Sequence, residues 1–153
     1  MNAADSARDL SALLVPVIGQ LLVVPSAVVV EIIKRRELVR PPGAPDWLLG
    51  TLQWHHERLP VLSFEALNGQ TDADAGHGSR IVITSALAEG GQRRNYAILA
   101  QGVPHLLLMT AADVQAVEAP ALGPAERMKV RVHGQDAAIP DFDFIEQHLA
   151  QLP

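Results

Sequence analysis

The sequence predicts an all-β protein, a barrel or a sandwich, from two observations. Short apolar runs recur at intervals of roughly 8–12 residues, which is typical of the strands in such folds. Aromatic residues make up only 4% of the 153 residues, while valine, leucine, isoleucine and alanine dominate. Branched aliphatic side chains pack well on a pleated surface. A chain of this length is expected to form one domain with a sizeable core.

The first strands are expected in residues 13–30, a stretch without any charge. A membrane helix of this length is conceivable, but Pro16 and Pro25 would each remove a helix hydrogen bond. Gly19-Gln20 would place a polar amide in lipid, and the flank lacks the basic region of a signal peptide. We therefore expect strands at Leu13–Ile18 and Leu21–Val24, joined by a turn, with residues 1–11 as an N-terminal tail.

The rest of the first half alternates between turns and strands. Ser26 is expected to cap a short helical turn, and residues 28–33 to resume an extended run. A proline-rich loop at 41–45 precedes Asp46–Gly50, which suggests a helical turn ended by its glycine. A hairpin is predicted from strands 51–54 and 59–64, with residues 55–58 near its turn. Residues 68–79 predict an exposed loop between two halves.

The second half repeats this style. Strands are expected at 80–87, 95–100, 103–109, 113–117, 128–132 and 137–140, with turns at 89–92 and 133–136. Residues 141–149 predict a closing helical segment that packs Phe142, Ile145 and Leu149 on one face.

Charge and cysteine content exclude several classes of protein. The net charge is −5, so the basic excess that is usual in nucleic-acid binders is missing. The basic cluster between Lys34 and Arg40 suggests a solvated surface or, alternatively, a contact with an acidic partner. Without cysteine the chain has no disulfide, no thiolate metal site and no cysteine nucleophile.

Candidate catalytic and metal-ligating residues are few. His55-His56 is the most conspicuous polar pair, but neighbouring strand residues point to opposite faces and cannot easily ligate one ion. Asp141, Asp143 and Glu146 are close in sequence, and charge at a helix N-terminus explains them better than a calcium site without the EF-hand pattern. We expect no metal, no cofactor and no catalysis, and we keep a metal-binding enzyme that uses His55 and His56 as the least favoured alternative.

A specific pattern occupies residues 28–62. It consists of Val29, Glu31-Ile32-Ile33, Pro42-Gly43-Ala44-Pro45, Leu48-Leu49-Gly50 and Leu59-Pro60-Val61-Leu62. This pattern resembles the CheW-like family of chemotaxis coupling proteins. The resemblance implies two small five-stranded SH3-like β-barrels packed over a shared apolar core, within one domain over residues 12–150. We expect the first barrel at about 12–66, plus a possible C-terminal return, and the second at about 79–140.

The resemblance also implies a function. Family members are non-catalytic cytoplasmic adaptors that bridge the cytoplasmic tip of a methyl-accepting chemoreceptor and the regulatory domain of a CheA-type histidine kinase. They neither insert into the membrane nor bind nucleic acid. By resemblance, the partner-binding residues would be Val29, Glu31, Gly50 and His55, whereas the kinase contact would use exposed ends of the second barrel.

This chain departs from the family pattern at three positions. His55 stands where the family has an arginine, so the guanidinium fork and its permanent charge are lost. Ala97 and Gln101 stand where the family has glycine and aspartate. The departures suggest a specialised adaptor, for example one that serves motility driven by type IV pili. Residues 139–143 resemble the divergent family members of that branch. The alternative is a competitor that blocks assembly of the kinase or receptor.

Overall fold

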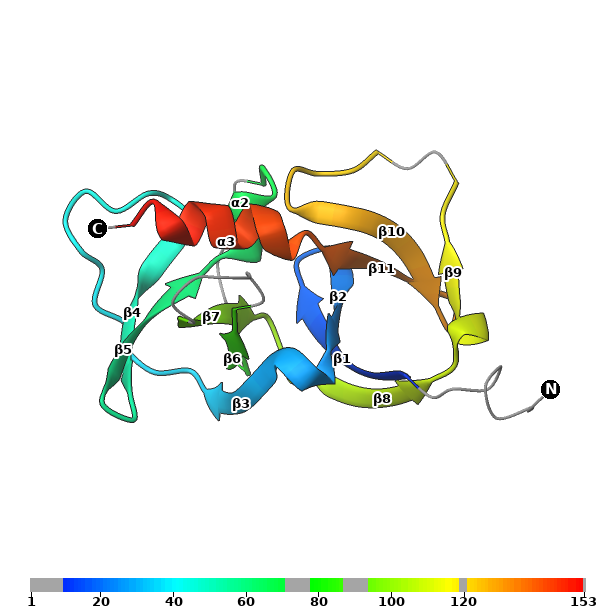
Figure 1. Cartoon of the computed structure of the whole chain (residues 1–153), viewed down its shortest axis with the longest axis horizontal. Helices are drawn as coiled ribbons and strands as arrows, with labels where there is room; N and C mark the ends of the chain where they lie inside the picture. Colours follow the sequence, from blue (N-terminus) through cyan, green and yellow to red (C-terminus); the bar gives the residue numbers. More distant parts are fainter. Residues whose placement is uncertain (1–9, 71–77, 87–93, 119–120, 153) are drawn as a thin grey trace.

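Eleven strands form two sheets in the computed structural model, which describes residues 10–70, 78–86, 94–118 and 121–152 (Figure 1). The first sheet has the order β8-β1-β2-β11-β10-β9. Its strands are β1 (Leu10–Val17), β2 (Gln20–Pro25), β8 (His105–Met109), β9 (Val114–Ala116), β10 (Glu126–Val132) and β11 (Gln135–Pro140). The second sheet has the order β3-β6-β7-β5-β4. Its strands are β3 (Val29–Lys34), β4 (Leu48–Trp54), β5 (Glu57–Leu62), β6 (Arg80–Ser85) and β7 (Asn95–Ala100).

Four short helical elements connect or cover the sheets. They are η1 (Ser26–Val28), α2 (Phe64–Leu67), η2 (Ala111–Asp113) and α3 (Phe142–Ala150). Figure 1 shows α3 lying across the top of the molecule from the first sheet toward the second. The predicted closing helix is confirmed, and Asp141 caps it because its carboxylate accepts a hydrogen bond from Phe144 N at 3.1 Å. Ile145 is fully buried, with Phe142 and Leu149 packed against the same cluster.

The core consists of three clusters of buried side chains. One belongs to the first sheet alone and includes Leu14 and Val130. Another belongs to the second sheet alone and includes Leu52 and Ile81. The third is larger and joins residues of both sheets to Ile145 of α3. The all-β prediction is therefore confirmed, in the form of two barrel-like sheets that share an apolar seam.

The uncharged opening stretch is buried on both faces. In β1, Leu13, Val15 and Val17 face the shared seam, while Ala12 and Leu14 face the interior of the first sheet. A strand that is covered on both sides becomes a continuous apolar run, which explains the missing charges. The predicted first hairpin is confirmed by the β1–β2 pairing around Gly19. No helix among the described residues is long and apolar enough to cross a membrane.

The second sheet closes on itself through the segment that follows β3. Val39 and Thr51 form a β-bridge, with N···O distances of 2.8 and 3.1 Å. Arg36 Nη1 donates to the carbonyl of Gln53 at 3.4 Å. The chain after β3 thus runs along the outer edge of β4, which would otherwise offer unpaired backbone groups.

Two local expectations were wrong. Ser26 is the first residue of η1 rather than its cap, and its hydroxyl donates instead to the carbonyl of Ser11 at 3.0 Å. Residues 48–50 do not form a helical turn but begin β4, with a bulge between Leu48 and Gly50. Position 50 does require a glycine, but the reason is that the chain at Leu38 and Val39 passes close to it, not that a helix ends there.

The sheets do not follow the division expected from the sequence. The strands β1 and β2 pair with β8 and β11 in the first sheet, whereas β3, β4 and β5 join β6 and β7 in the second. Neither 12–66 nor 79–140 therefore matches one sheet, and β11, near the C-terminal end of the described residues, pairs in parallel with β2. Such long-range pairings leave no local signal in the sequence. The predicted turn at 89–92 and most of the loop at 68–79 lie outside the described residues.

Two buried carboxylates fasten the β1–β2 turn to α2 and its flank. Glu65, 1% exposed, accepts hydrogen bonds from Ile18 N at 3.0 Å and from Gln101 Nε2 at 3.2 Å. Glu126, 5% exposed, accepts from four donors, which are Gln20 Nε2, Asn68 Nδ2, Gly123 N and Lys129 Nζ. Burial works to raise the pKa of Glu126, but these donors outweigh it and hold the pKa below its ordinary value.

Candidate docking face on strands β3 and β8

A bulge in β3 brings three consecutive side chains to the surface. Val29 pairs with Thr84 and Glu31 with Ile83, so Val30 is an extra residue on β3. Such a bulge breaks the alternation of a strand and re-aims its side chains. As a result Val30 is 47% exposed and Ile32 39% exposed, with Glu31 between them.

Glu31 reaches across to the end of β4. Its Oε1 accepts a hydrogen bond from the indole Nε1 of Trp54 at 2.9 Å. The same oxygen lies 3.7 Å from Nε2 of His55, and the side chains of Glu31 and His55 are 45% and 71% exposed. The rings of Trp54 and His55 meet edge to face, with centroids 4.6 Å apart. We call Glu31, Trp54 and His55 the carboxylate cluster.

His55 and His56 form the turn of the β4–β5 hairpin. Both have left-handed backbones, with φ of 43° and 67°. A two-residue hairpin turn of this kind matches the twist of the strands, but it favours Asn and Gly over histidine. The predicted hairpin is confirmed, with its histidines in the turn itself rather than on a strand. Among the described residues no group of three side chains could hold a metal ion, so the metal alternative gains no support.

Gly50 is buried in β4 because the returning chain passes directly over it. A Cβ at this position would lie 2.7 Å from Cβ of Leu38 and 3.0 Å from the carbonyl oxygen of Val39. Its φ of 155° is also one that other residues rarely adopt. Gly50 thus allows the segment after β3 to pack against β4, which keeps Glu31 near Trp54. As a glycine, it contributes no side chain to the surface.

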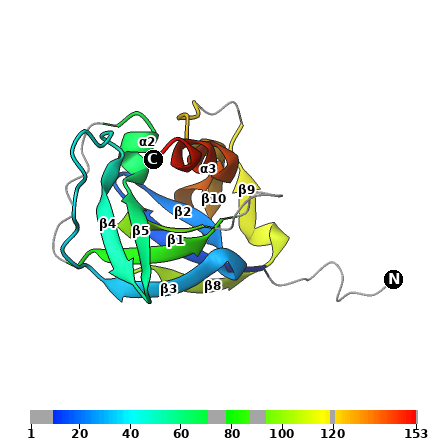
Figure 2. The same cartoon turned by 60° about the vertical axis from the view of Figure 1, so that its left-hand side comes forward.

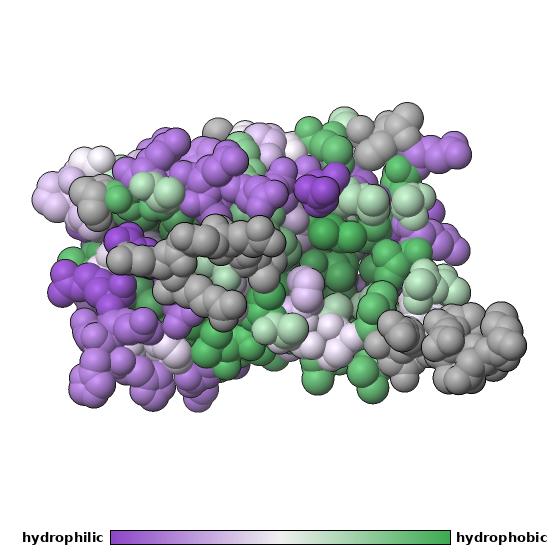
Figure 3. Space-filling view, viewed as in Figure 1, coloured by the Kyte–Doolittle hydropathy of each residue, from purple (hydrophilic) through white to green (hydrophobic). Residues whose placement is uncertain are grey.

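A second pair of exposed aliphatic side chains lies on β8. Leu106 and Leu108 are 65% and 66% exposed. Both views of the cartoon place β3 and β8 along the same lower side of the molecule (Figures 1 and 2). In the space-filling view, apolar side chains gather along this lower edge beside hydrophilic ones at the left (Figure 3). We call Val30, Ile32, Leu106 and Leu108, together with the carboxylate cluster, the docking face.

The four residues expected from the sequence take different places in this site. Glu31 and His55 come together in the carboxylate cluster, and Gly50 lies beneath the segment that closes the sheet. Val29 is half-buried and packs against the shared seam. Gln101, a departure from the family pattern, donates to the buried Glu65 rather than to anything at the surface.

Sequence reasoning missed Val30, Ile32, Trp54, Leu106 and Leu108. Leu106 and Leu108 were predicted only as part of an apolar strand. Their exposure depends on β8 being an edge strand, which only the pairing with β1 reveals. The one available signal was the segment Val28–Ile33, in which apolar residues do not alternate with polar ones and only Glu31 is charged.

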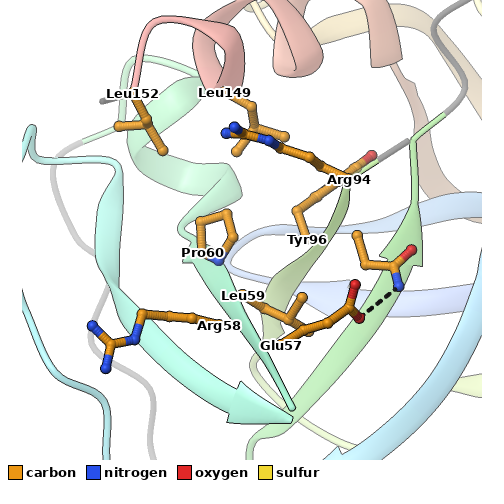
Figure 4. A pocket seen from close by; sticks show the side chains of 9 residues that line it. Glu57, Arg58, Leu59, Pro60, Arg94, Tyr96, Leu149 and Leu152 are labelled. Carbon is orange, nitrogen blue, oxygen red and sulfur yellow. Dashed lines mark hydrogen bonds between the residues drawn. The ribbon is translucent and has the colours of Figure 1, made fainter. Parts of the chain in front are cut away.

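A separate hollow of about 290 Å³ lies between α3 and the strands β5 and β7 (Figure 4). Leu149 and Leu152 of the C-terminal segment face Pro60 and Tyr96 across it, and Glu57 accepts a hydrogen bond from Asn95 at 3.3 Å. The hydroxyl of Tyr96 is buried without a hydrogen-bond partner among the described residues. Burial, followed by the charge of Glu146, raises the pKa of Tyr96 far above its ordinary value. This hydroxyl therefore stays protonated at neutral pH and is a poor general base.

Two small barrels, an apolar seam and an exposed apolar face define a protein-interaction module. The CheW-like domain model matches residues 11–143, and the chain therefore belongs to the CheW-like domain family. The crystal structure of the scaffolding protein TtCheW from Thermoanaerobacter tengcongensis has a similar fold, with a TM-score of 0.72 and 13% sequence identity. The match covers 87% of this chain and 89% of that one. No curated protein matches the chain closely enough to be counted as a relative.

Proposed function

We propose that the protein is a non-catalytic cytoplasmic adaptor in a chemosensory pathway. It would couple the cytoplasmic tip of a methyl-accepting chemoreceptor to the regulatory domain of a CheA-type histidine kinase. Membership of the CheW-like family supports this proposal. The observation that carries it is the docking face, where exposed Val30 and Ile32 flank the Glu31–Trp54 hydrogen bond and Leu106 and Leu108 are exposed on β8.

Exposed apolar side chains that cluster beside polar groups are characteristic of interaction surfaces. Val30 and Ile32 on one strand and Leu106 and Leu108 on another would contact the apolar side of a receptor helix. Val29, Glu31, Gly50 and His55 would take part in different ways. Glu31 and His55 would touch the partner, while Val29 and Gly50 would keep β3 and the closing segment in position.

The first experiment is a calorimetric titration of the protein with the receptor tip and with the kinase regulatory domain from the same genome. We expect binding to both in the micromolar range. Val30→Glu should weaken receptor binding at least about tenfold, because it buries a charge in an apolar contact. Leu122→Glu is a matched control, since Leu122 is equally exposed at 47% but lies on the loop before β10.

An equal loss of affinity in both variants, or none in either, would argue against the docking face. Circular dichroism would show that both variants fold. Val30 is preferred to Val29 for this test because Val29 also packs against the seam.

A competitor that blocks assembly is the second candidate, and it is favoured by the histidine at position 55. Kinase activity reconstituted with receptor separates the two. Activation on addition of the protein supports coupling, and inhibition supports blocking. Control of type IV pili is a further proposal, which rests on the resemblance of residues 139–143 and is tested by twitching of a deletion strain.

A further inference from the structure

The two sheets have four edge strands, and three of them are protected against pairing with a further strand. The edge of β4 is covered by the segment after β3, through the bridge between Val39 and Thr51. The edge strand β3 carries a bulge and the charged side chains of Glu31 and Lys34. The edge strand β9 is only three residues long. Coverage, bulges, charges and shortness are the devices by which proteins keep sheet edges from pairing.

The fourth edge strand, β8, has none of these protections among the described residues. Its five residues include no lysine, carboxylate or proline, and its register with β1 runs without a bulge. Leu106 and Leu108 are 65% and 66% exposed, and no described segment pairs with the side of β8 that faces away from β1. The strand therefore offers an open, apolar edge to a further strand.

The pairing of β1 shows which backbone groups of β8 point outward. Val17 and Gln20 flank the two-residue turn of the β1–β2 hairpin, so they form a hydrogen-bonded pair, and every second residue back along β1 also bonds to β2. The residues between them direct their backbone groups to the other side, toward β8. The carbonyl of Pro16 accordingly accepts a hydrogen bond from Gln101 N at 2.8 Å, on the chain that leads into β8.

The same alternation applies to β8. Ala12 belongs to the set that faces β8, and it pairs with Leu107. Because backbone groups alternate in direction from one residue to the next, the N–H and C=O groups of Leu106 and Leu108 point away from β1. The two leucines with exposed side chains are thus also the two residues whose backbone groups face outward.

We propose that a second copy of this chain occupies this edge, so that two β8 strands run antiparallel about a two-fold axis at Leu107. In this register Leu106 lies opposite Leu108 of the second copy, and Leu108 lies opposite its Leu106. Each of these two pairs exchanges two backbone hydrogen bonds, which uses every outward group of both leucines. The axis is perpendicular to the sheet, so all four leucine side chains lie on one face as cross-strand pairs.

The order of residues in β8 favours a second copy over an unrelated strand. Any extended strand could satisfy the backbone groups, but the run Leu106-Leu107-Leu108 is palindromic and gives a second copy a leucine opposite every leucine. No like charges meet at the axis, because the residue there is Leu107. Two five-residue strands form a small contact, and interfaces below about 1,200 Å² are typically weak and transient. We therefore expect a dimer that forms as the protein is concentrated.

Sedimentation of the full chain from about 20 μM to about 1 mM measures this association. The wild type should change from monomer to dimer across the range. Leu106→Lys and Leu108→Glu should each weaken the dimer about fivefold or more, because symmetry introduces each unmatched charge twice. Met128→Lys is the matched control and should leave association unchanged, since Met128 is 44% exposed on β10.

The double variant Leu106→Lys/Leu108→Glu tests the register. With the axis at Leu107, each lysine lies opposite a glutamate of the second copy, so the double variant should associate more strongly than either single variant. In a register shifted by two residues, lysine would face lysine or glutamate would face glutamate. The double variant would then associate no better than the single variants.

Hydrogen exchange of the backbone amides identifies the strand without any substitution. In dilute wild-type protein the amide of Leu107 should be protected by its hydrogen bond to β1, whereas the amides of Leu106 and Leu108 should exchange quickly. On concentration, Leu106 and Leu108 should become protected, and the amide of Leu107 should stay protected as before.

Three results would overturn the dimer: a wild-type protein that stays monomeric at the highest concentration, association that both single variants leave unchanged, or exchange at Leu106 and Leu108 that concentration does not slow. Protection of these amides only when the receptor tip or the kinase domain is added would assign the edge to a strand of that partner instead. This inference does not rest on the proposed function, because the protein is measured alone. Loss of receptor binding would leave it standing.

Discussion

At the scale of single residues, the docking face depends on details that sequence patterns only partly reveal. Glu31 and His55 could be chosen from their resemblance to a family pattern, and they do meet in the fold. Val30 and Ile32 could not, because one inserted residue in β3 reverses which side chains face outward. Strand periodicity assumes two residues per repeat, and a bulge leaves no unique residue type to reveal it.

Gly50 allows a test at this scale. Gly50→Ala places a Cβ against Leu38 and the Val39 carbonyl, so the closing segment must shift away from β4. We expect a loss of about 2–3 kcal/mol in the free energy of unfolding, as for overpacking of a tight contact. Denaturant unfolding measures this loss.

Gly43→Ala is the control for backbone strain alone, since Gly43 has a φ of +75° but open space around its Cβ position. That variant should lose about 1 kcal/mol. Equal losses in the two variants would show that conformation, rather than the close approach of the segment, requires glycine at position 50.

At the scale of elements, most strands were predictable because each apolar run is bounded by turn residues. Turn chemistry also located the β1–β2 hairpin and the β10–β11 hairpin, where His133-Gly134 forms the turn. The start of β4 was missed because Gly50 follows a short apolar stretch, as the glycine at a helix end does. The need for glycine at position 50 becomes clear only in the fold, where Leu38 and Val39 pass directly over it.

The attachment of the β1–β2 turn to the end of α2 makes a second prediction, about pH. The pKa of Glu126 is lowered in the folded protein, so its contribution to stability is present above its ordinary value of 4.5 and is lost as the pH falls through the lower folded value. Glu126→Gln should therefore cost about 1–3 kcal/mol at neutral pH. The difference from wild type should shrink in acid.

Urea unfolding at neutral pH and at about pH 3 measures this difference. Asp136→Asn is the control. The Asp136 side chain is 77% exposed and pairs with Arg131 at 3.4 Å on the surface, so its loss should change the free energy of unfolding little at either pH. A gap between Glu126→Gln and wild type that stays constant with pH would show that the carboxylate is not charged when it receives its four donors.

At the scale of the whole molecule, the two sheets exchange strands from opposite ends of the sequence. The β1–β2 hairpin is completed by β8 and β11, and the seam takes side chains from β1, β2, β4 to β7, β11, η1, α2 and α3. The architecture could be anticipated through a family resemblance, but the pairing could not. The pattern of apolar residues defines which segments are strands, whereas their partners depend on packing between segments far apart in the sequence, such as β2 and β11.

This exchange predicts that the sheets do not fold separately. The full chain should unfold in one transition, seen at the same denaturant concentration by tryptophan fluorescence and by circular dichroism. A fragment of residues 1–66, the expected first barrel, should remain unfolded because β1 and β2 lack their outer neighbours. A cooperative transition in that fragment would contradict the shared seam as the source of stability.

The parallel pairing of β2 with β11 also has a consequence during synthesis. About 110 residues separate these strands, so at a translation rate of roughly 5–20 residues per second the first hairpin waits roughly 5 to 20 s for its neighbour. In that interval the edge of β2 that later pairs with β11 offers unpaired backbone groups. The nascent chain therefore keeps an uncharged strand edge open until β11 is made, and we expect a chaperone to bind this edge during synthesis.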